Sequence, residues 1–384
     1  MQVISTIVGA VCALLALAGA AYFALCVSAA GRFRRQTKHS AQLDFEPPVS
    51  ILKSLKGLDP QMYAAFRSHC RFDYQEYELL FGASDPDEPA LTLVKRLQQD
   101  FPLRTIRVVP CPRNLGMNGK VSTLAQMLPK ARYEHILIND SDIVAPPDYL
   151  RRVMCLIADE RVGMVTSLYR GLAGKTLMSR MEALGLSTDF MGGVLVAREI
   201  EGGVRFALGA TMATTKTVLR DIGGLETLVD YLGDDYELGA RTAAAGYKVE
   251  LSDVVVETTL PDYSFRGFWS HQLRWARNVK DRRHAQYFGL IVTFGLVWGV
   301  LAVLTAPHAW WAWVALLMVG LSRLAAAVAV GRGVLDDPGV MRDLWLVPLR
   351  DFVALAVWVV SFLGDEVEWR AMRFRVRDGK LEKI

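Results

Sequence analysis

The sequence has few cysteines and carries little net charge. Its five cysteines include no Cys-x-x-Cys pair, and their number is odd: Cys12, Cys26, Cys70, Cys111 and Cys155. We therefore predict reduced, packed thiols in a reducing compartment rather than a disulfide framework. The net charge of +4 over 384 residues does not indicate a nucleic-acid-binding protein. The chain also has no internal repeat and no low-complexity segment.

Charge is absent from the first 30 residues, which contain no Asp, Glu, Lys or Arg. A run of this length can cross a bilayer as a helix. Four basic residues follow it: Arg32, Arg34, Arg35 and Lys38. A secretory signal has its basic residues before the apolar core, so we predict a retained transmembrane anchor over residues 1–30. Its N-terminus would lie outside, and a linker over 31–48 would lie in the cytoplasm.

A second uncharged stretch covers residues 285–322 and is too long for one span. Pro307 divides it, so we predict a transmembrane hairpin over 285–330. Basic residues flank both ends of this hairpin, which favours placing both ends in the cytoplasm. The protein would then be a multi-pass protein of the cell membrane with its central domain in the cytoplasm.

A third apolar stretch, residues 344–363, is interrupted by Pro348, Arg350 and Asp351. The tail beyond it is basic, and a full crossing would place that tail outside, against the usual charge distribution. We therefore predict a membrane-associated or re-entrant segment with a basic tail over 331–384. The chain would have one N-terminal and two to three C-terminal membrane helices.

Residues 49–264 alternate between short apolar runs and segments of helical pattern. Strands are predicted over 49–52, 77–83, 105–109 and 135–139, and helices over 61–70, 90–100 and 121–128. This alternation predicts an α/β domain whose mostly parallel sheet has helices on both faces. In such a sheet, ligands bind outside the carboxyl ends of the strands.

The strand at 135–139 leads directly into Asp140-Ser141-Asp142. An Asp-x-Asp pattern puts both carboxylates on one side of an extended backbone. Two such oxygen ligands suit Mg²⁺ or Mn²⁺ that also holds a substrate diphosphate. A solvated turn is the alternative, because Asp and Ser are common turn residues.

Three other segments carry candidate groups. Asp85 follows the strand at 77–83 and could accept a hydrogen bond from a nucleobase or ribose, or the acidic cluster around it could cap the next helix. Lys120 lies in a Gly-containing loop that lacks the P-loop pattern, and it could approach a diphosphate or be solvated. Asp234 and Asp235 begin a helix, either as caps or, for Asp235, as a general base.

Residues 265–284 are rich in aromatic and basic side chains and precede the hairpin. They predict an amphipathic helix on the bilayer surface. Within it, Arg274 could neutralise a departing diphosphate, and Trp275 could stack on a sugar or an acceptor.

In chain order, these groups resemble the D, D-x-D, (E/D)D, Q-x-x-R-W series of membrane-bound, inverting glycosyltransferases with the GT-A fold. The match is made by Asp85, Asp140-Ser141-Asp142, Asp234-Asp235 and Arg274-Trp275. Within that group the chain looks most like the ceramide glucosyltransferase family, and it is similar to the hopanoid-associated glycosyltransferases. His271 stands where the family usually has Gln or Arg, with Gln272 beside it.

The resemblance implies a Rossmann-like GT-A catalytic domain over 49–264. This domain would move a hexose or N-acetylhexosamine from a UDP-sugar to a hydroxyl group of a membrane lipid of ceramide or hopanoid type. Asp85 would contact the uridine, and Asp140 and Asp142 would contact the ribose and the diphosphate bound to Mg²⁺ or Mn²⁺. Asp235 would be the base of a single displacement.

The remaining site residues follow from the same resemblance. Arg274 and Trp275 would act with the base, and the other substrate contacts would be Lys120, Asp234, Gly209, Thr211, His271 and Gln272. Small residues at 206–211 would let a hexose approach the backbone, or would form a structural turn. Two other functions remain open: a polysaccharide or polyprenyl-phosphate sugar transferase, and a non-catalytic membrane protein that binds a nucleotide sugar.

Overall fold

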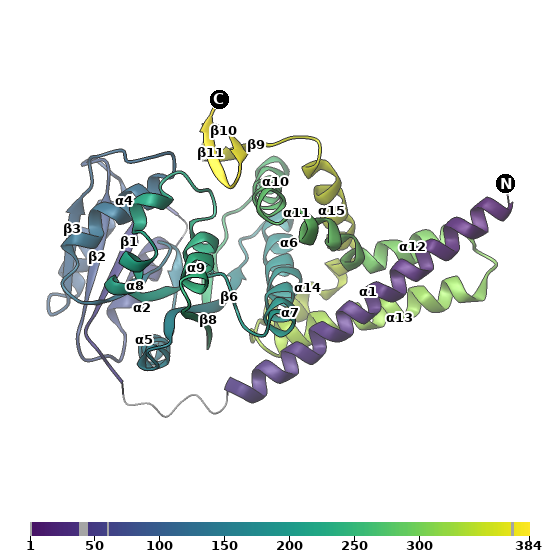
Figure 1. Ribbon diagram of the computed structural model, residues 1–384, viewed down its shortest axis with the longest axis horizontal. Helices are drawn as coiled ribbons and strands as arrows, with labels where there is room; N and C mark the ends of the chain where they lie inside the picture. The colour runs from purple at the N-terminus through teal and green to yellow at the C-terminus, as the bar shows by residue number, and fades with distance from the viewer. Residues whose placement is uncertain (1, 38–44, 60, 370–371) are drawn as a thin grey trace. The chain divides into compact units, whose positions relative to one another are not determined.

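The computed structural model describes residues 2–37, 45–59, 61–369 and 372–384 (Figure 1). The chain folds into two compact units. The first, which we call the sheet unit, comprises residues 36–172, 200–261 and 379–384. The second, the helical unit, comprises residues 1–35, 173–199 and 262–378. Part of the predicted linker, residues 38–44, lies outside the described residues.

The sheet unit contains an eight-stranded sheet with the order β3-β2-β1-β4-β7-β6-β8-β5. The strands are β1 (Val49–Ser54), β2 (Tyr77–Ala83), β3 (Thr105–Pro110), β4 (His135–Ile138), β5 (Ile143–Val144), β6 (Val162–Leu172), β7 (Met212–Thr215) and β8 (Lys248–Thr259). β1 pairs in parallel with β2 and β4, as do β2 with β3 and β6 with β8. Only β7 and β5 run antiparallel to their neighbours. The predicted α/β class is confirmed, and the four predicted strands are β1 to β4.

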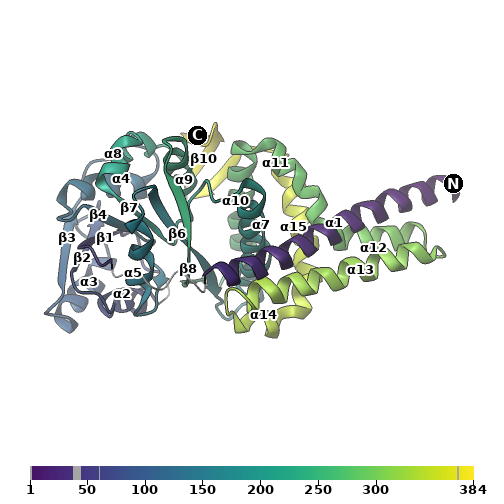
Figure 2. The ribbon, with the colours of Figure 1, turned by 60° about the horizontal axis from the view of Figure 1, so that its bottom comes forward.

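Helices cover both faces of this sheet (Figure 2). They are α2 (Met62–Cys70), α3 (Ala90–Asp100), α4 (Gly119–Met127), α5 (Tyr149–Met154), α8 (Lys216–Asp221) and α9 (Asp234–Ala244). The last strand of the chain, β11 (Lys380–Lys383), also belongs to this unit, where Leu381 N–H donates to the carbonyl oxygen of Asp230.

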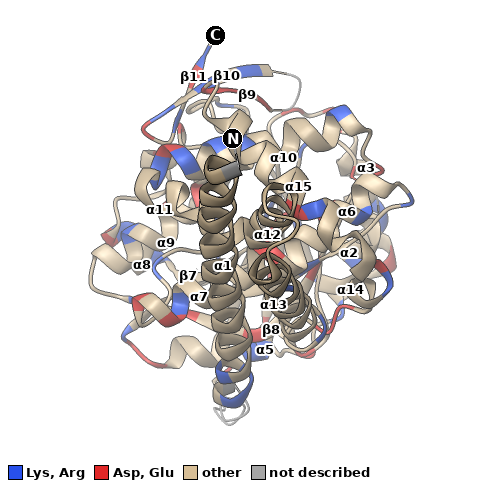
Figure 3. Cartoon of the chain, turned by 90° about the vertical axis from the view of Figure 1, so that its right-hand side faces the viewer, with Lys and Arg blue, Asp and Glu red and all other residues tan. Residues whose placement is uncertain are grey.

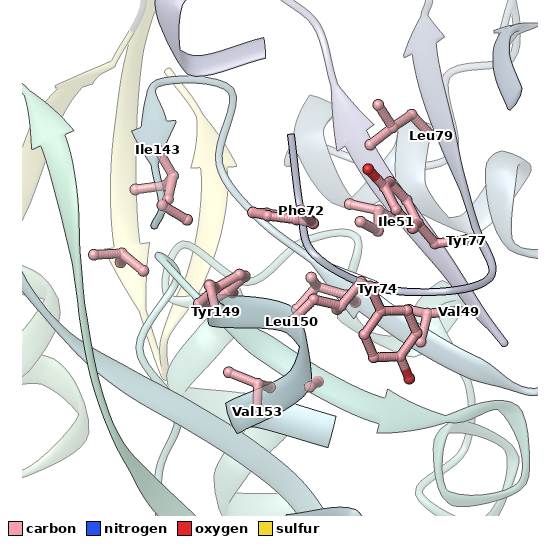
Figure 4. Close-up of a cluster of buried hydrophobic side chains, with 14 of the residues drawn as sticks. Val49, Ile51, Phe72, Tyr74, Tyr77, Leu79, Ile143, Tyr149, Leu150 and Val153 are labelled. Atoms are coloured by element: carbon pink, nitrogen blue, oxygen red, sulfur yellow. The ribbon is translucent and has the colours of Figure 1, made fainter. Parts of the chain in front are cut away.

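One face of the sheet packs on a continuous apolar core (Figure 4). Ile51 of β1 and Leu79 of β2 belong to this core together with Phe72 and Tyr149. Successive strand residues point to opposite faces, and Leu52 is also fully buried. Because both faces are covered, the ends of the parallel strands are held firmly, and the side chains just beyond them are well placed to form a site.

The helical unit contains most of the remaining helices. They are α1 (Gln2–Thr37), α6 (Leu177–Gly185), α7 (Met191–Glu201), α10 (Phe265–Arg282), α11 (His284–Gly289), α12 (Gly295–Thr305), α13 (Trp310–Ala327), α14 (Pro338–Asp343) and α15 (Val347–Ser361). Strands β9 (Glu366–Trp369) and β10 (Met372–Arg377) form an antiparallel pair within it. The helix predicted from residue 265 is α10. Helix α1 continues past residue 30, so the first residues of the predicted linker are helical.

Among the described residues of the helical unit, four segments are long and apolar enough to cross a membrane: Val3–Gln36, His284–Thr305, Trp310–Arg332 and Pro338–Ser361. Figure 3 shows α1, α12 and α13 almost free of charged residues along most of their length. Large apolar side chains such as Ile7, Leu14 and Leu321 are exposed on these helices, as expected where lipid covers them. The predicted N-terminal helix and three C-terminal candidates are therefore present, and they indicate a membrane protein.

The charges that interrupt the third C-terminal segment have partners inside the helical unit. Asp351 is buried and lies 2.8 Å from the guanidinium of Arg323, which belongs to the preceding candidate span. Arg350 donates to the side-chain oxygen of Gln272 over 2.9 Å. Since these charges are paired or hydrogen-bonded, they do not by themselves prevent residues 338–361 from entering a membrane.

Candidate active site

The Asp-Ser-Asp segment begins where β4 ends, at the carboxyl edge of the parallel strands. Asn139, which is buried, donates from its amide nitrogen to Tyr149 Oη over 2.9 Å and to the carbonyl oxygen of Ala210 over 2.6 Å. Lys53 of β1 is fully buried and donates from Nζ to the carbonyl oxygen of Asp140 over 3.0 Å. This segment is therefore anchored from both sides and is not a freely solvated turn.

Asp142 is held close to a second negative charge. The Thr258 hydroxyl of β8 donates to its carboxylate. Burial, together with the negative charge of Asp140, raises the pKa of Asp142 to about 6. A cation bound beside Asp140 and Asp142 would stabilise the ionised form of Asp142.

Lys120 lies between two carboxylates. Its Nζ is 2.7 Å from Asp140 Oδ1 and 3.1 Å from Asp234 Oδ2, and its side chain is 16% exposed. Burial alone would lower the pKa of Lys120, but the charges of Asp140 and Asp234 outweigh this effect and raise it. The alternative of a solvated lysine is therefore not what the structure shows.

The start of α4 fixes the position of Lys120. Asn118 caps this helix, because its side-chain oxygen accepts from the backbone N–H of Lys120 over 3.1 Å and of Val121 over 3.2 Å. The amide nitrogen of Asn118 also donates to the carbonyl oxygen of Tyr231 over 2.7 Å. The loop is thus tied to the segment that leads into α9 and Asp234.

Asp235 is the second residue of α9, and its side chain is half-buried. Its Oδ2 accepts from the backbone N–H of Gly209 over 2.9 Å, and its Oδ1 accepts from the backbone N–H of Tyr236 over 2.8 Å. Burial is the main cause that raises the pKa of Asp235 to about 6; the charge of Asp234 adds to it and that of Lys120 opposes it. A carboxyl group with this pKa can exchange a proton near neutral pH.

Two glycines permit these close approaches. A Cβ atom on Gly209 would lie 3.1 Å from Asp140 Oδ2 and 3.2 Å from Asp235 Oδ2, so both carboxylates lie beside Gly209 on the side where a larger residue would carry its side chain. A Cβ atom on Gly239 of α9 would lie 2.1 Å from the backbone nitrogen of Ala207. The bare backbone of Gly239 therefore lets α9 pack on the segment before Gly209, which brings Asp235 to its position.

Two other predicted residues occupy different surroundings in the sheet unit. Asp85 follows β2 and is exposed, and its Oδ1 accepts from the backbone N–H of Asp87 over 2.9 Å. No side chain among the described residues caps the start of α3, so the acidic cluster around Asp85 does not act as a cap of that helix. Thr211 is fully buried, and its hydroxyl lies 2.8 Å from Tyr149 Oη. The Thr211 side chain supports the turn after Gly209, so a sugar could contact the backbone here more readily than this hydroxyl.

The remaining predicted residues lie on α10, in the helical unit. His271 Nδ1 is 3.2 Å from Glu182 Oε1, and Gln272 Nε2 donates to Glu182 Oε2 over 2.6 Å. The ring of Trp275 packs against His271 at 5.4 Å between centroids, and the Arg274 guanidinium lies 6.0 Å from the Trp369 ring centroid. The buried carboxylate of Glu182 therefore holds the part of α10 that precedes Arg274 and Trp275.

Sequence reasoning missed three residues that support the site: Lys53, Asn118 and Asn139. Two of them, Lys53 and Asn118, had a weak signal in the sequence. Lys53 interrupts the apolar strand that begins at Val49, and a lysine at such a position needs a buried partner. Asn118 precedes a helix at the position where Asn is a favoured cap.

The carboxylates of Asp140 and Asp142 form a candidate site for a divalent metal ion. Among the described residues, no group of three or more His, Cys, Asp and Glu side chains is arranged to hold a metal ion. Mg²⁺ and Mn²⁺ bound with a nucleotide take one or two protein carboxylates, while phosphate oxygens and water fill the other positions. Asp140 and Asp142 supply a donor set of this kind, and the raised pKa of Asp142 is consistent with it.

Comparison with known proteins places this site in context. The sequence pattern of glycosyl transferase family 21 matches residues 11–382. Ceramide glucosyltransferase 1 of Caenorhabditis elegans is 23% identical over 347 residues, which cover 87% of this chain and 72% of that protein. Ceramide glucosyltransferase 3 of the same organism is 26% identical over 247 residues, which cover 64% of this chain and 53% of that protein.

A solved structure shares the fold. The mannosyltransferase PcManGT from Pyrobaculum calidifontis, determined in complex with GDP-Man and Mn²⁺, superimposes with a TM-score of 0.51 at 19% sequence identity. The similarity covers 91% of this chain and 98% of that one. Together with the mostly parallel sheet, it confirms the predicted fold class, a GT-A-like catalytic domain with membrane helices.

Proposed function

Because the chain belongs to glycosyl transferase family 21, and is therefore a glycosyltransferase, we propose that it glycosylates a membrane lipid. The donor is a UDP-linked hexose or N-acetylhexosamine, and the acceptor is a hydroxyl group of a lipid of ceramide or hopanoid type. The reaction is a single displacement that inverts the configuration at the anomeric carbon.

One observation carries this proposal: charged groups from distant parts of the sequence converge on Gly209. Asp140 follows β4, Asp235 begins α9, and both carboxylates lie within reach of the Gly209 backbone. Lys120 adds a positive charge between Asp140 and Asp234. Such a convergence at the carboxyl edge of the sheet suits a nucleotide diphosphate beside a general base.

Asp235 acts as the base in this proposal. Its carboxylate takes the proton of the acceptor hydroxyl group as that oxygen attacks the anomeric carbon. The bond from the anomeric carbon to the diphosphate oxygen breaks, and its electron pair remains on the diphosphate. Lys120 stabilises the negative charge that develops there. A pKa of about 6 keeps Asp235 mostly ionised at neutral pH and ready to accept the proton.

Asp140 and Asp142 hold Mg²⁺ or Mn²⁺ in the proposed complex. A divalent ion bound there supplies positive charge to the leaving diphosphate. Lys53 and Asn139 hold the backbone around Asp140, and the Thr258 hydroxyl donates to the carboxylate of Asp142, so little backbone rearrangement is needed when the ion and the donor bind. Asp85 contacts the uridine in this scheme, and Arg274 and Trp275 contribute to the leaving group and the acceptor.

The membrane segments support a lipid acceptor. A sphingoid or polyisoprenoid lipid remains in the bilayer, whereas the donor is soluble. An enzyme with four candidate spans can take one substrate from each phase. We further propose that the catalytic domain faces the cytoplasm, because basic residues follow the N-terminal span at Arg32, Arg34 and Arg35.

The purified full-length chain in detergent tests this function. It should be incubated with radiolabelled UDP-glucose, UDP-N-acetylglucosamine or UDP-galactose, each with ceramide, a hopanoid alcohol or diacylglycerol. Labelled lipid should form with one donor class, and EDTA should abolish its formation until Mn²⁺ or Mg²⁺ is restored. Label that appears only in polymer would favour a polysaccharide synthase, and donor hydrolysis without lipid product would contradict the proposed acceptor.

A further inference from the structure

A cavity of about 370 Å³ lies in the helical unit, separate from the residues assigned above. Its lining consists of Arg277, Lys280, Asp281, His284, Asp365, Arg375, Val376 and Arg377. Four of these side chains are Lys or Arg and two are Asp, so the lining is positive overall. Cavities that bind small molecules usually measure about 300–1,000 Å³, so this one can hold a compact polar group.

The basic side chains come from two separate segments of the helical unit. Arg277 and Lys280 lie one turn apart near the end of α10, and Arg375 and Arg377 alternate with buried residues on β10. Figure 3 shows Lys and Arg along β10. The like charges are therefore gathered by the fold and not by sequence proximity alone.

Arg277 carries the clearest sign of a missing partner. One of its terminal nitrogens donates to the carbonyl oxygen of Glu366, but its Nε is buried without a hydrogen-bond partner. A buried donor left without a partner costs free energy, unless a ligand supplies an acceptor.

The local electrostatics agree with this. Burial lowers the pKa of Arg277, while Asp365 and Glu366 act in the opposite direction. Burial and the positive charge of Arg277 both lower the pKa of Lys280, although Asp365 and Asp281 raise it. The charged forms of both side chains would therefore be stabilised by an anion in the cavity.

The cavity also has a defined place along the chain. His284 is the first residue of the candidate span His284–Thr305, and Asp365 follows the candidate span Pro338–Ser361 by four residues. Lys280 Nζ donates to the carbonyl oxygens of Ser361 and Gly364, at the end of that second span. The cavity therefore lies where two candidate spans end, which is the depth of lipid headgroups in a bilayer.

We propose that this cavity binds a phosphate group, of the kind that an anionic phospholipid presents at the membrane surface. Arg377 and Arg375 contact the phosphate from β10, and Arg277 contacts it from α10. The negative charge of Asp365 repels the phosphate and therefore weakens its binding. The bound headgroup ties α10, which also carries Arg274 and Trp275, to the bilayer surface.

Binding to the purified full-length chain in a neutral detergent tests the proposal. Short-chain phosphatidylglycerol, diacylglycerol with the same acyl chains, and inorganic phosphate are titrated separately, and binding is read by calorimetry. Phosphatidylglycerol should bind saturably, and diacylglycerol, which lacks the phosphate, should bind much more weakly. If inorganic phosphate displaces phosphatidylglycerol, the phosphate alone is recognised; if it does not, recognition also requires the lipid. Both results support the proposal, because both require the phosphate.

Paired variants separate a built site from general surface charge. Arg377→Gln should weaken phosphatidylglycerol binding about fivefold, as expected for one basic residue near anionic lipid. The matched control is Arg373→Gln, on the same strand but outside the cavity lining, which should leave affinity unchanged. Asp365→Asn should strengthen binding, a gain that a misfolded variant would not show.

Two results would overturn the proposal. One is equal affinity for phosphatidylglycerol and diacylglycerol. The other is an equal loss of affinity in Arg377→Gln and Arg373→Gln, which would indicate nonspecific attraction. Because the readout is binding without a nucleotide sugar, the outcome does not depend on whether the proposed transferase reaction occurs.

Discussion

The charges around Asp235 should set the pH at which the enzyme becomes active. Lys120 and Asp234 act on the Asp235 carboxylate in opposite directions, and the result is a pKa of about 6. A base must be ionised to accept a proton, so kcat/KM should fall as the pH drops below about 6. Such a profile reports the free enzyme's essential groups.

The fall of kcat/KM at low pH is the acid limb of the pH profile. Removing Lys120 should move this acid limb to higher pH. An opposite charge within about 4–6 Å lowers a carboxyl pKa by about 1–3 units. Lys120→Gln removes the opposite charge that lowers the pKa of Asp235, so the acid limb should shift upward by about one pH unit. Asp234→Asn removes a like charge, so its limb should shift below that of the wild type. One pKa unit corresponds to about 1.4 kcal/mol of interaction with the ionised carboxylate.

The assay is transfer of labelled hexose to lipid between about pH 5 and pH 9, at one saturating Mn²⁺ concentration so that the ion contributes equally to every variant. Both substitutions will also lower the transfer rate, because both residues belong to the proposed donor site. The measured quantity is therefore the pH at which kcat/KM falls to half of its plateau value, and not the plateau value itself. Lys95→Gln, which removes an exposed lysine on α3, is the matched control. Limbs that stay in place in both variants, or that move in the same direction, would refute the reasoning.

Three further substitutions test how the site is supported. Gly209→Ala places a Cβ atom 3.1 Å from Asp140 Oδ2, so the rate of sugar transfer should fall about tenfold because the carboxylate is displaced. In the control Gly31→Ala, the added atom meets nothing within 4 Å, so its rate should match the wild type. Equal transfer rates in the two variants would contradict the close approach at Gly209. Asn118→Ala removes the cap of α4 and should lower the free energy of unfolding by about 1 kcal/mol in chemical denaturation, and unchanged stability would count against the cap. Lys53→Met removes an ammonium group whose pKa is lowered by burial to about 7, and this lowered pKa reduces the stability of the native state at neutral pH. The variant should therefore have a melting temperature no lower than that of the wild type, but it should transfer sugar more slowly. Full transfer activity would contradict the positioning role of Lys53.

The first half of the sheet could be read from the sequence because local patterns determine it. β2 has the predicted bounds, and β1, β3 and β4 differ from theirs by at most two residues. Each is a short apolar run bounded by turn residues, and the first three are each followed by a helical pattern. The opposite half could not be read in this way. β7 is a short strand of mixed character, Met212–Thr215, and it enters between β4 and β6 in the antiparallel direction. Such pairing depends on long-range contacts that no local pattern records.

The site was predictable in its residue types but not in its contacts. The acidic side chains drew attention because they follow apolar strands or begin helices. The position of Lys120 between Asp140 and Asp234 joins segments that are 20 and 114 residues away from it in the sequence, and only the fold brings them together. On α10, sequence spacing could not reveal that Glu182 accepts from Gln272 and lies beside His271. The strands β9 and β10 were not predicted, because charged residues alternate along both of them.

The most direct test of the central claim is a paired measurement on Asp235→Asn. Equilibrium binding of the UDP-sugar and transfer of its sugar to lipid are measured on the same preparation. Donor affinity should stay within about threefold of the wild type, because amide and carboxylate side chains are similar in size, while transfer should fall by about 10²-fold or more. Transfer at the wild-type rate would contradict the assignment of Asp235 as the base.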